Sequence, residues 1–118
     1  MRPIIGITMG DAAGIGPEII VKALGRKDVY DWCKPLVIGD AKMLERALAI
    51  TGMALSVDRI DDPSFGRYEP GTVDCLDLDL LPADLPFGRV SSEAGNAAFH
   101  YVKKAVELAM ERAIHAIC

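Results

Sequence analysis

A short apolar segment leads into a glycine-rich turn and then into the start of a helix, and this order constrains the fold most. Residues 4–8 read Ile-Ile-Gly-Ile-Thr, whose β-branched side chains favour a strand. Three glycines fall within residues 9–16, and Pro17 and Glu18 follow them. Proline suits the first helical position, and an acidic side chain there complements the helix dipole. The order strand, turn, helix predicts the opening of an α/β fold.

The same alternation continues along the chain. We expect strands at 36–38, 54–60 and 72–78, a helix at about 41–50, a loop at 80–89, a long alanine-rich helix from Ser91 or Ser92 to Arg112, and the start of a buried strand at 114–118. In the long helix we expect the apolar face to comprise Ala94, Ala98, Tyr101, Val102, Ala105, Leu108 and Ala109. Strands that alternate with helices indicate a sheet covered on both faces. The sequence therefore predicts an α/β/α sandwich with a largely parallel sheet.

Length and composition exclude several classes of protein. The 118 residues carry 13 Lys and Arg against 17 Asp and Glu, for a net charge of −4. This balance provides no basic surface for nucleic acid, and no apolar run approaches the roughly 20 residues of a membrane span. Three cysteines without C-x-x-C spacing predict reduced, buried thiols in a cytoplasmic protein. A chain of this length can bury one core, which is too little for a complete two-domain enzyme.

The turn at residues 9–16 is the candidate site that the pattern itself indicates. Its glycines allow backbone N–H groups to approach a ligand, and the helix N-terminus that follows favours anions. Open α/β sheets bind ligands beyond the carboxyl ends of their strands, where this turn lies. Its G-x-x-x-G-x-G spacing matches neither the dinucleotide fingerprint nor the P-loop, so the glycines alone equally fit a tight turn without a ligand. We interpret Asp11 as a turn residue that bonds its own backbone, with a ligand contact as the alternative.

The complete string is more specific than its glycines. Residues 7–18 read I-T-M-G-D-A-A-G-I-G-P-E, which resembles the opening signature of the 4-hydroxythreonine-4-phosphate dehydrogenase family, with Ala12 where the family usually has proline. Residues 88–95, G-R-V-S-S-E-A-G, are similar to the family's G-x-V-S-x-x-x-G segment. The resemblance extends from Ile4 to Cys118. It implies a fold like that of isocitrate and isopropylmalate dehydrogenases, with residues 1–118 as the N-terminal part of one α/β domain and the second domain absent.

The resemblance also implies an activity. Family members carry out an NAD- or NADP-dependent, metal-assisted oxidation and decarboxylation of 4-phosphohydroxy-L-threonine in pyridoxal 5'-phosphate biosynthesis. A divalent cation (Zn, Mg or Co) stabilises charge on the substrate oxygen while the cofactor takes the hydride. Two alternatives stay open. One is a related dehydrogenase of another 4-phosphorylated sugar acid or of a cis-dihydrodiol carboxylate, and the other is a non-catalytic phosphate-binding or assembly module. We expect a cytoplasmic homodimer that binds a small phosphorylated hydroxy acid and neither nucleic acid nor membrane.

The resemblance assigns cofactor-binding positions but no catalytic or metal-binding ones. The positions beside the nicotinamide cleft are Gly10, Asp11, Gly14, Ile15 and Gly16. In the family, a T-A-P-x-N-K segment, the metal-binding histidines and the substrate-phosphate contacts all come after the position of Cys118. His100 and His115 match none of these ligands. We therefore expect the chain alone to be inactive.

Other polar residues receive structural interpretations. We interpret Asp40 as the N-cap of the helix that follows it rather than as a ribose-binding acid. We interpret the serines at 91–92 as helix caps rather than nucleophiles. Asp74, Asp77 and Asp79 are spaced like a calcium loop but lack its glycine and distal glutamate, so we expect them to be solvated carboxylates.

Overall fold

The computed structural model is built on one five-stranded parallel sheet with the strand order β3-β4-β2-β1-β5. It describes residues 1–88 and 91–118, so Arg89 and Val90, expected in the loop and in the second family segment, lie outside the described residues. The strands are β1 (Ile4–Thr8), β2 (Lys34–Gly39), β3 (Ser56–Ile60), β4 (Thr72–Asp77) and β5 (Ala116–Ile117). The helices are α1 (Gly16–Leu24), α2 (Val29–Trp32), α3 (Ala41–Thr51) and α4 (Ser92–Met110), with a 3-10 turn at Pro63–Phe65.

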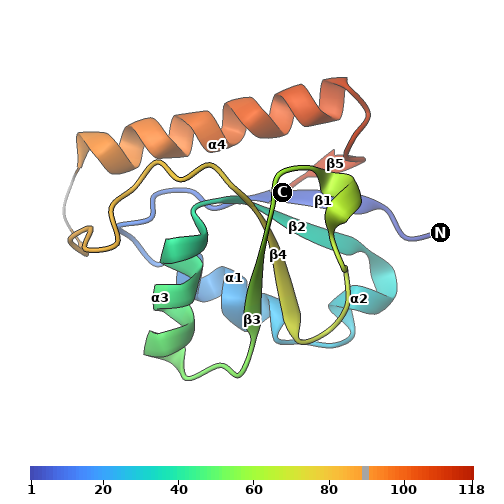
Figure 1. Ribbon diagram of the computed structural model, residues 1–118, viewed down its shortest axis with the longest axis horizontal. Coiled ribbons are helices and arrows are strands. Elements are labelled where there is room, and N and C mark those ends of the chain that lie inside the picture. Colours follow the sequence, from blue (N-terminus) through green and yellow to red (C-terminus); the bar gives the residue numbers. More distant parts are fainter. Residues whose placement is uncertain (89–90) are drawn as a thin grey trace.

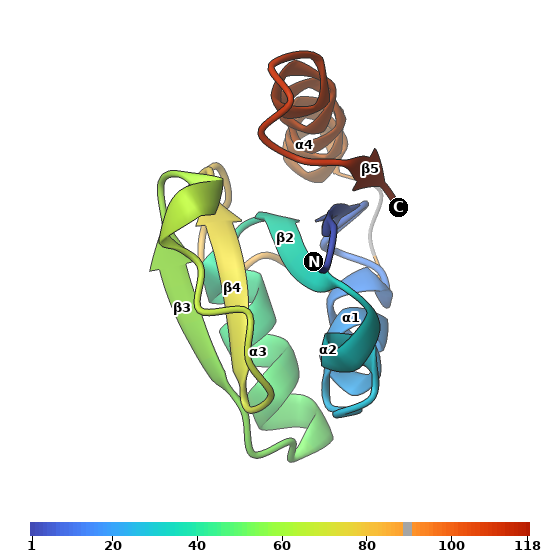
Figure 2. The same cartoon turned by 90° about the vertical axis from the view of Figure 1, so that its right-hand side faces the viewer.

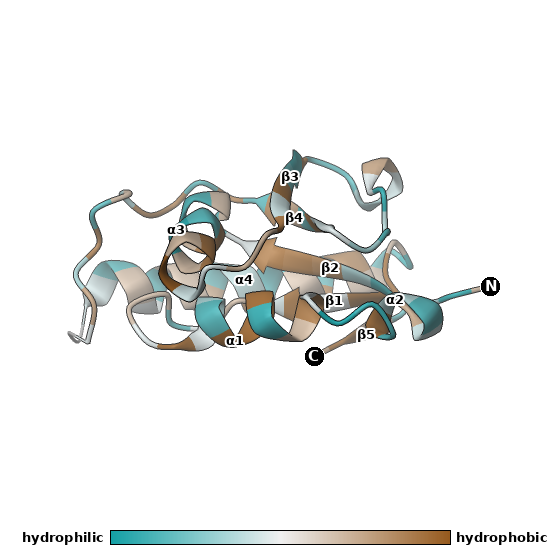
Figure 3. Cartoon of the chain, turned by 90° about the horizontal axis from the view of Figure 1, so that it is seen from below, coloured by the Kyte–Doolittle hydropathy of each residue, from teal (hydrophilic) through white to brown (hydrophobic). Residues whose placement is uncertain are grey.

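Helices cover both faces of the sheet. Figure 1 shows α4 along one face, and α1 and α3 on the other, with the turned view in Figure 2 agreeing. Most of β2 is hydrophobic in Figure 3, whereas α1 and α3 alternate between hydrophobic and hydrophilic segments, as expected of helices with one buried side. The predicted α/β fold with a parallel sheet is confirmed.

The long helix packs against the sheet through small side chains. Its buried residues are Ala94, Ala97, Tyr101, Ala105 and Leu108. Alanines bring the helix axis close to the sheet, and Tyr101 fills the deeper space between them. Four of the seven predicted residues are buried, and Ala98 and Ala109 are partly buried. The predicted face omits the buried Ala97 and wrongly includes Val102, which is 51% exposed because the helix turns it away from the sheet.

Other expectations need correction. The four-residue α2 and the 3-10 turn have no counterpart among the predicted elements, because helices this short leave no periodic pattern. Cys75 is buried as expected, but Cys33 is only partly buried and Cys118 is exposed, so the prediction of three buried thiols is wrong. Within residues 1–88 and 91–118, no helix combines the length and apolarity needed to cross a membrane.

Candidate functional site

The carboxyl ends of the central strands bring three chain segments to one edge of the sheet. The glycine turn, residues 9–15, follows β1, Asp40 follows β2, and residues 78–88 follow β4. All strand pairs are parallel, so these segments leave the sheet on the same side. This is the edge where open α/β sheets bind their ligands.

The glycine turn is held by its own backbone and by Asp11. The Asp11 carboxylate accepts a hydrogen bond from the Ala13 N–H at 2.9 Å, and the Gly14 N–H donates to the Asp11 carbonyl at 3.0 Å. Asp11 therefore bonds the backbone of its own turn, as expected, and its contact with a ligand stays a prediction. Ile15 occupies the N-cap position of α1 but provides no side-chain hydrogen bond. The first turn of α1 thus begins without a side-chain cap, which suits it to an anionic ligand.

The three glycines of the turn serve different purposes. Gly10 has a φ of +71°, a conformation that glycine adopts without strain. A Cβ at Gly16 would lie 2.6 Å from the Met9 carbonyl oxygen, so the turn can close only around glycine. A Cβ at Gly14 would meet the Asp11 carbonyl oxygen at 3.4 Å, an ordinary contact. The fold therefore does not require glycine at position 14.

All five predicted cofactor-binding residues lie together on this turn and its junction with α1. Gly10, Asp11, Gly14 and Ile15 are exposed, and Gly16 is half-buried. Ile15 is 66% exposed, which is unusual for isoleucine. The turn therefore places an exposed apolar residue beside the start of α1, which no side chain caps.

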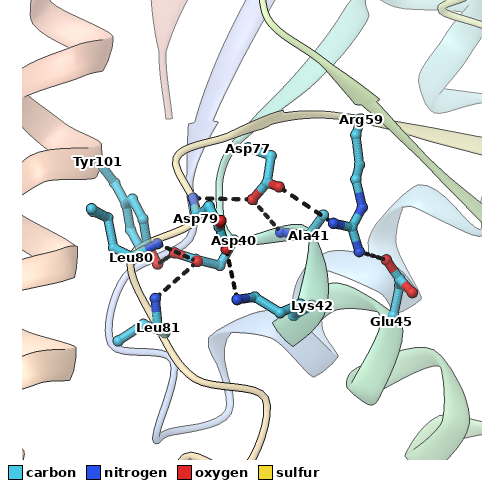
Figure 4. Close-up of polar contacts among 10 residues, drawn as sticks. All are labelled: Asp40, Ala41, Lys42, Glu45, Arg59, Asp77, Asp79, Leu80, Leu81 and Tyr101. Atoms are coloured by element: carbon cyan, nitrogen blue, oxygen red, sulfur yellow. Dashed lines mark hydrogen bonds and ion pairs between the residues drawn. The ribbon is translucent and has the colours of Figure 1, made fainter.

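Asp40 is buried, and its carboxylate binds groups from distant parts of the chain. One oxygen accepts hydrogen bonds from the Leu80 and Leu81 N–H groups at 2.7 and 3.1 Å, and the other accepts one from the Tyr101 hydroxyl (Figure 4). Burial and the nearby carboxylate raise the pKa of Tyr101 far above its usual value, so the hydroxyl keeps its proton. With both oxygens occupied and the residue 0% exposed, Asp40 has no oxygen to offer a ribose.

The predicted cap of α3 comes from a different residue. Asp40 stands at the N-cap position but makes no side-chain cap. Asp77, at the end of β4, instead accepts hydrogen bonds from the Ala41 N–H at 3.1 Å and the Asp79 N–H at 3.2 Å (Figure 4). The interpretation of Asp40 as a side-chain cap is therefore wrong, because its oxygens bind the chain that follows β4.

The expectation of three solvated carboxylates holds only for Asp79. Asp79 is exposed and pairs with Lys42 at 2.6 Å, and this hydrogen bond lowers the pKa of the Asp79 carboxyl. Asp77 is 14% exposed in its side chain. Asp74 is fully buried, accepts hydrogen bonds from the N–H groups of Arg67 and Tyr68, and has its pKa raised by burial. No sequence pattern marks these bonds, because the donors are backbone groups of other segments.

Residues 78–88, most of which lie in the predicted loop at 80–89, run from the end of β4 to the glycine turn. Leu81 and Leu85 are buried. Arg46 donates to the Leu85 carbonyl at 2.6 Å, and its guanidinium lies 3.7 Å from the centre of the Phe87 ring. The Gly88 N–H donates to the Ala13 carbonyl at 2.8 Å, which connects this segment directly to the turn.

The remaining polar predictions concern Ser91, Ser92 and the histidines. Ser91 accepts a hydrogen bond from the Ala94 N–H at 3.3 Å and is the cap of α4, whereas Ser92 is its first helical residue. His115 accepts a hydrogen bond from the backbone N–H at the start of β1, at the opposite edge of the sheet. Among the residues that the structure describes, no three His, Cys, Asp or Glu side chains gather as they would around a metal ion.

Relatives match this chain over nearly its whole length. The D-threonate 4-phosphate dehydrogenase of Cupriavidus necator is 52% identical over 116 residues, which are 98% of this chain and 35% of that protein. A crystal structure of a 4-hydroxythreonine-4-phosphate dehydrogenase from Burkholderia phymatum superposes with a TM-score of 0.98 at 58% identity, covering 100% of this chain and 36% of that one. A terephthalate 1,2-cis-dihydrodiol dehydrogenase from Burkholderia xenovorans is more distant, with a TM-score of 0.75, 27% identity, and coverage of 99% and 33%.

The chain thus spans about a third of the length of the relatives that it matches. Residues 31–118 match the family described as pyridoxal phosphate biosynthetic protein PdxA. The glycine turn precedes this range but lies within the span shared with the Burkholderia phymatum enzyme. On these grounds the chain belongs to the PdxA family, whose members compared above are named as dehydrogenases.

Proposed function

We propose that this chain is the N-terminal part of one α/β domain of an NAD- or NADP-dependent dehydrogenase that oxidises a 4-phosphorylated hydroxy acid. The observation that carries the proposal is the glycine turn at the carboxyl edge of the sheet. It begins α1 without a side-chain cap and presents Gly14 and Ile15 to solvent. The names of the relatives supply the reaction class.

Each residue of the turn has a role in this proposal. The N-terminus of α1, which no side chain caps, attracts a negatively charged group of the cofactor. The exposed Ile15 side chain provides an apolar contact for a flat ring. Asp11, Gly10 and Gly16 keep the turn in shape. When bound, the nicotinamide accepts the hydride, and these residues bind and orient it.

The divalent metal of the family (Zn, Mg or Co) does not fit the residues of this chain. The described residues contain no cluster of three metal-binding side chains, and the buried carboxylates Asp40 and Asp74 already accept backbone hydrogen bonds. We therefore assign no metal ligand and no catalytic residue to residues 1–118. The predicted inactivity of the chain alone, the homodimer and the cytoplasmic location stay predictions.

Two substrates follow from the names of the relatives. D-Threonate 4-phosphate and 4-phosphohydroxy-L-threonine both carry a carboxylate at one end and a phosphate at carbon 4, and they differ in a hydroxyl or an amino group at carbon 2. The first is a 4-phosphorylated sugar acid and is favoured by the name of the 52% identical protein of Cupriavidus necator. The second is favoured by the name of the 58% identical protein of Burkholderia phymatum.

The first test is the intact mass of the protein purified from its native source, followed by an assay of that protein. We expect a mass about three times the 12.7 kDa of this chain, and reduction of NAD or NADP with one of the two substrates and a divalent metal. A mass of 12.7 kDa without cofactor reduction would favour the phosphate-binding or assembly module.

A matched pair of glycine variants tests the role of the turn. In the full-length enzyme, Gly14→Ala should raise the KM for the cofactor about tenfold, because a methyl group obstructs the approach to the backbone. Gly95→Ala is the control, since a Cβ at this position in α4 meets no atom within 4 Å. Equal cofactor KM values for both variants would show that the turn does not belong to the cofactor site.

A further inference from the structure

We infer that Asp40 and Tyr101 are positioning residues that hold the glycine turn in its ligand-binding shape. This inference rests on the proposed function for the identity of the ligand. It assigns a role to two buried residues, both 0% exposed, that would not touch the ligand.

The Asp40 carboxylate joins three elements in the interior. It belongs to the end of β2, its hydrogen-bond donors Leu80 and Leu81 belong to the segment that follows β4, and Tyr101 belongs to the middle of α4 (Figure 4). A buried carboxylate is costly to desolvate, and these three donors compensate for the lost water. Its polar oxygens accept donors only in particular directions, so the carboxylate fixes the position of the segment after β4 more narrowly than an apolar contact would.

Two contacts transmit this position to the glycine turn. The segment anchored at Leu80 and Leu81 ends at Gly88, whose N–H donates to the Ala13 carbonyl at 2.8 Å. Gly39, the residue before Asp40, makes the second contact. A Cβ at Gly39 would lie 2.7 Å from the Cβ of Met9, so the end of β2 lies directly against the first residue of the turn. A displacement of Asp40 or of residues 80–81 therefore changes the contacts that the turn makes at Met9 and at Ala13.

Tyr30 provides the matched comparison for Tyr101. Its ring is also buried, at 4% exposed, and its hydroxyl donates to the Thr72 carbonyl at 2.9 Å. Thr72 begins β4, so this bond lies at the amino edge of the sheet, away from the turn. Tyr30→Phe and Tyr101→Phe each delete one hydroxyl and its one hydrogen bond, which is part-buried and made to a carbonyl at Tyr30, and buried and made to a carboxylate at Tyr101.

The experiment compares these two variants in the full-length enzyme. Amide hydrogen exchange is measured at residues 9–16 and 80–88, together with kcat and the KM for the cofactor. We expect Tyr101→Phe to speed exchange in both ranges and to raise the cofactor KM about tenfold with little change in kcat. Tyr30→Phe should leave all of these values unchanged even where it lowers the melting temperature to the same extent.

A third variant, Asp40→Asn, tests rescue by a group of the same shape. Its amide oxygen can still accept from Leu80 and Leu81, and its amide nitrogen can donate to the Tyr101 hydroxyl. We expect exchange at residues 9–16 and the cofactor KM to stay near the wild-type values.

The outcomes separate this inference from the proposed function. Unchanged exchange at residues 9–16 in Tyr101→Phe would overturn the inference, whether or not the enzyme is active. Faster exchange with an unchanged cofactor KM in an active enzyme would also overturn it, because the turn would move without affecting the ligand. A wild-type enzyme that reduces neither cofactor would end the proposed function, while exchange at residues 9–16 would still decide whether Asp40 and Tyr101 hold the turn.

Discussion

Two neighbouring parts of the carboxyl edge of the sheet are built in opposite ways. The part beyond β2 and β4 is held by buried or nearly buried carboxylates. The glycine turn beyond β1 is held mainly by short backbone contacts, with Asp11 as its one acidic side chain. In the first arrangement both Asp40 oxygens accept hydrogen bonds, and Asp77 caps α3 and pairs with Arg59. In the second, Gly14 and Ile15 are exposed. In the function proposed above, the carboxylate part is therefore the framework and the turn is the binding surface.

The hydrogen bonds of this framework connect β2 and β4 in both directions. Asp40, at the end of β2, accepts from the Leu80 and Leu81 N–H groups that follow β4. Asp77, at the end of β4, accepts from the Ala41 N–H that follows β2. Each strand therefore fixes the chain that leaves its neighbour, which keeps two adjacent strand ends in register.

The largest expected effect comes from removing one carboxylate of this pair. Asp40→Ala removes the acceptor of the Leu80 and Leu81 N–H groups and of the buried Tyr101 hydroxyl, and should lower the free energy of unfolding by about 3 kcal/mol. Asp77→Ala deletes a helix cap at a partly solvated position and should cost about 1 kcal/mol. Urea unfolding of the full-length enzyme measures both. Equal losses of unfolding free energy in the two variants would show that the burial of Asp40 does not increase its contribution to stability.

The second prediction separates the glycines of the turn. Gly16→Ala places a methyl group 2.6 Å from the Met9 carbonyl oxygen and should cost about 2 kcal/mol of stability. Gly14→Ala meets only an ordinary contact and should change stability by less than about 0.5 kcal/mol, its effect falling on the ligand instead. Thermal unfolding of the two variants provides the measurement. A Gly14→Ala variant as unstable as Gly16→Ala would mean that both glycines only shape the turn.

The same comparison explains what the sequence could predict. The glycine turn was found because strand, glycines and helix start are contiguous within residues 4–18, and local patterns express local structure. The α/β fold with a parallel sheet followed from the alternation of such patterns. The strand order was not predicted, because it depends on contacts between segments far apart in the chain.

The framework could not be predicted for a similar reason. The Asp40 carboxylate meets donors 40, 41 and 61 positions away, and Asp77 caps a helix that starts 36 positions earlier. An aspartate just before a helix is typical of a local cap, so the local rule gave Asp40 the role that Asp77 fills. Two of the three donors to Asp40 are backbone N–H groups, which every residue except proline carries.

The smallest predicted effect concerns the start of α4, where the sequence left two serines as candidate caps. The Ser91 hydroxyl accepts from the Ala94 N–H at 3.3 Å, so Ser91→Ala should lower the free energy of unfolding by about 1 kcal/mol. Ser92 is exposed in the first helical position, and Ser92→Ala should change it by less than about 0.3 kcal/mol, since alanine is a better helix former. The effect stays small because Ala94, Ala97 and Tyr101 keep the first half of α4 packed against the sheet. Urea unfolding of both variants tests the assignment. A larger loss of unfolding free energy for Ser92→Ala than for Ser91→Ala would show that Ser92 is the cap. α4 therefore begins with a side-chain cap and α1 begins without one. Of these two helices, only α1 leaves its N-terminus open to a ligand.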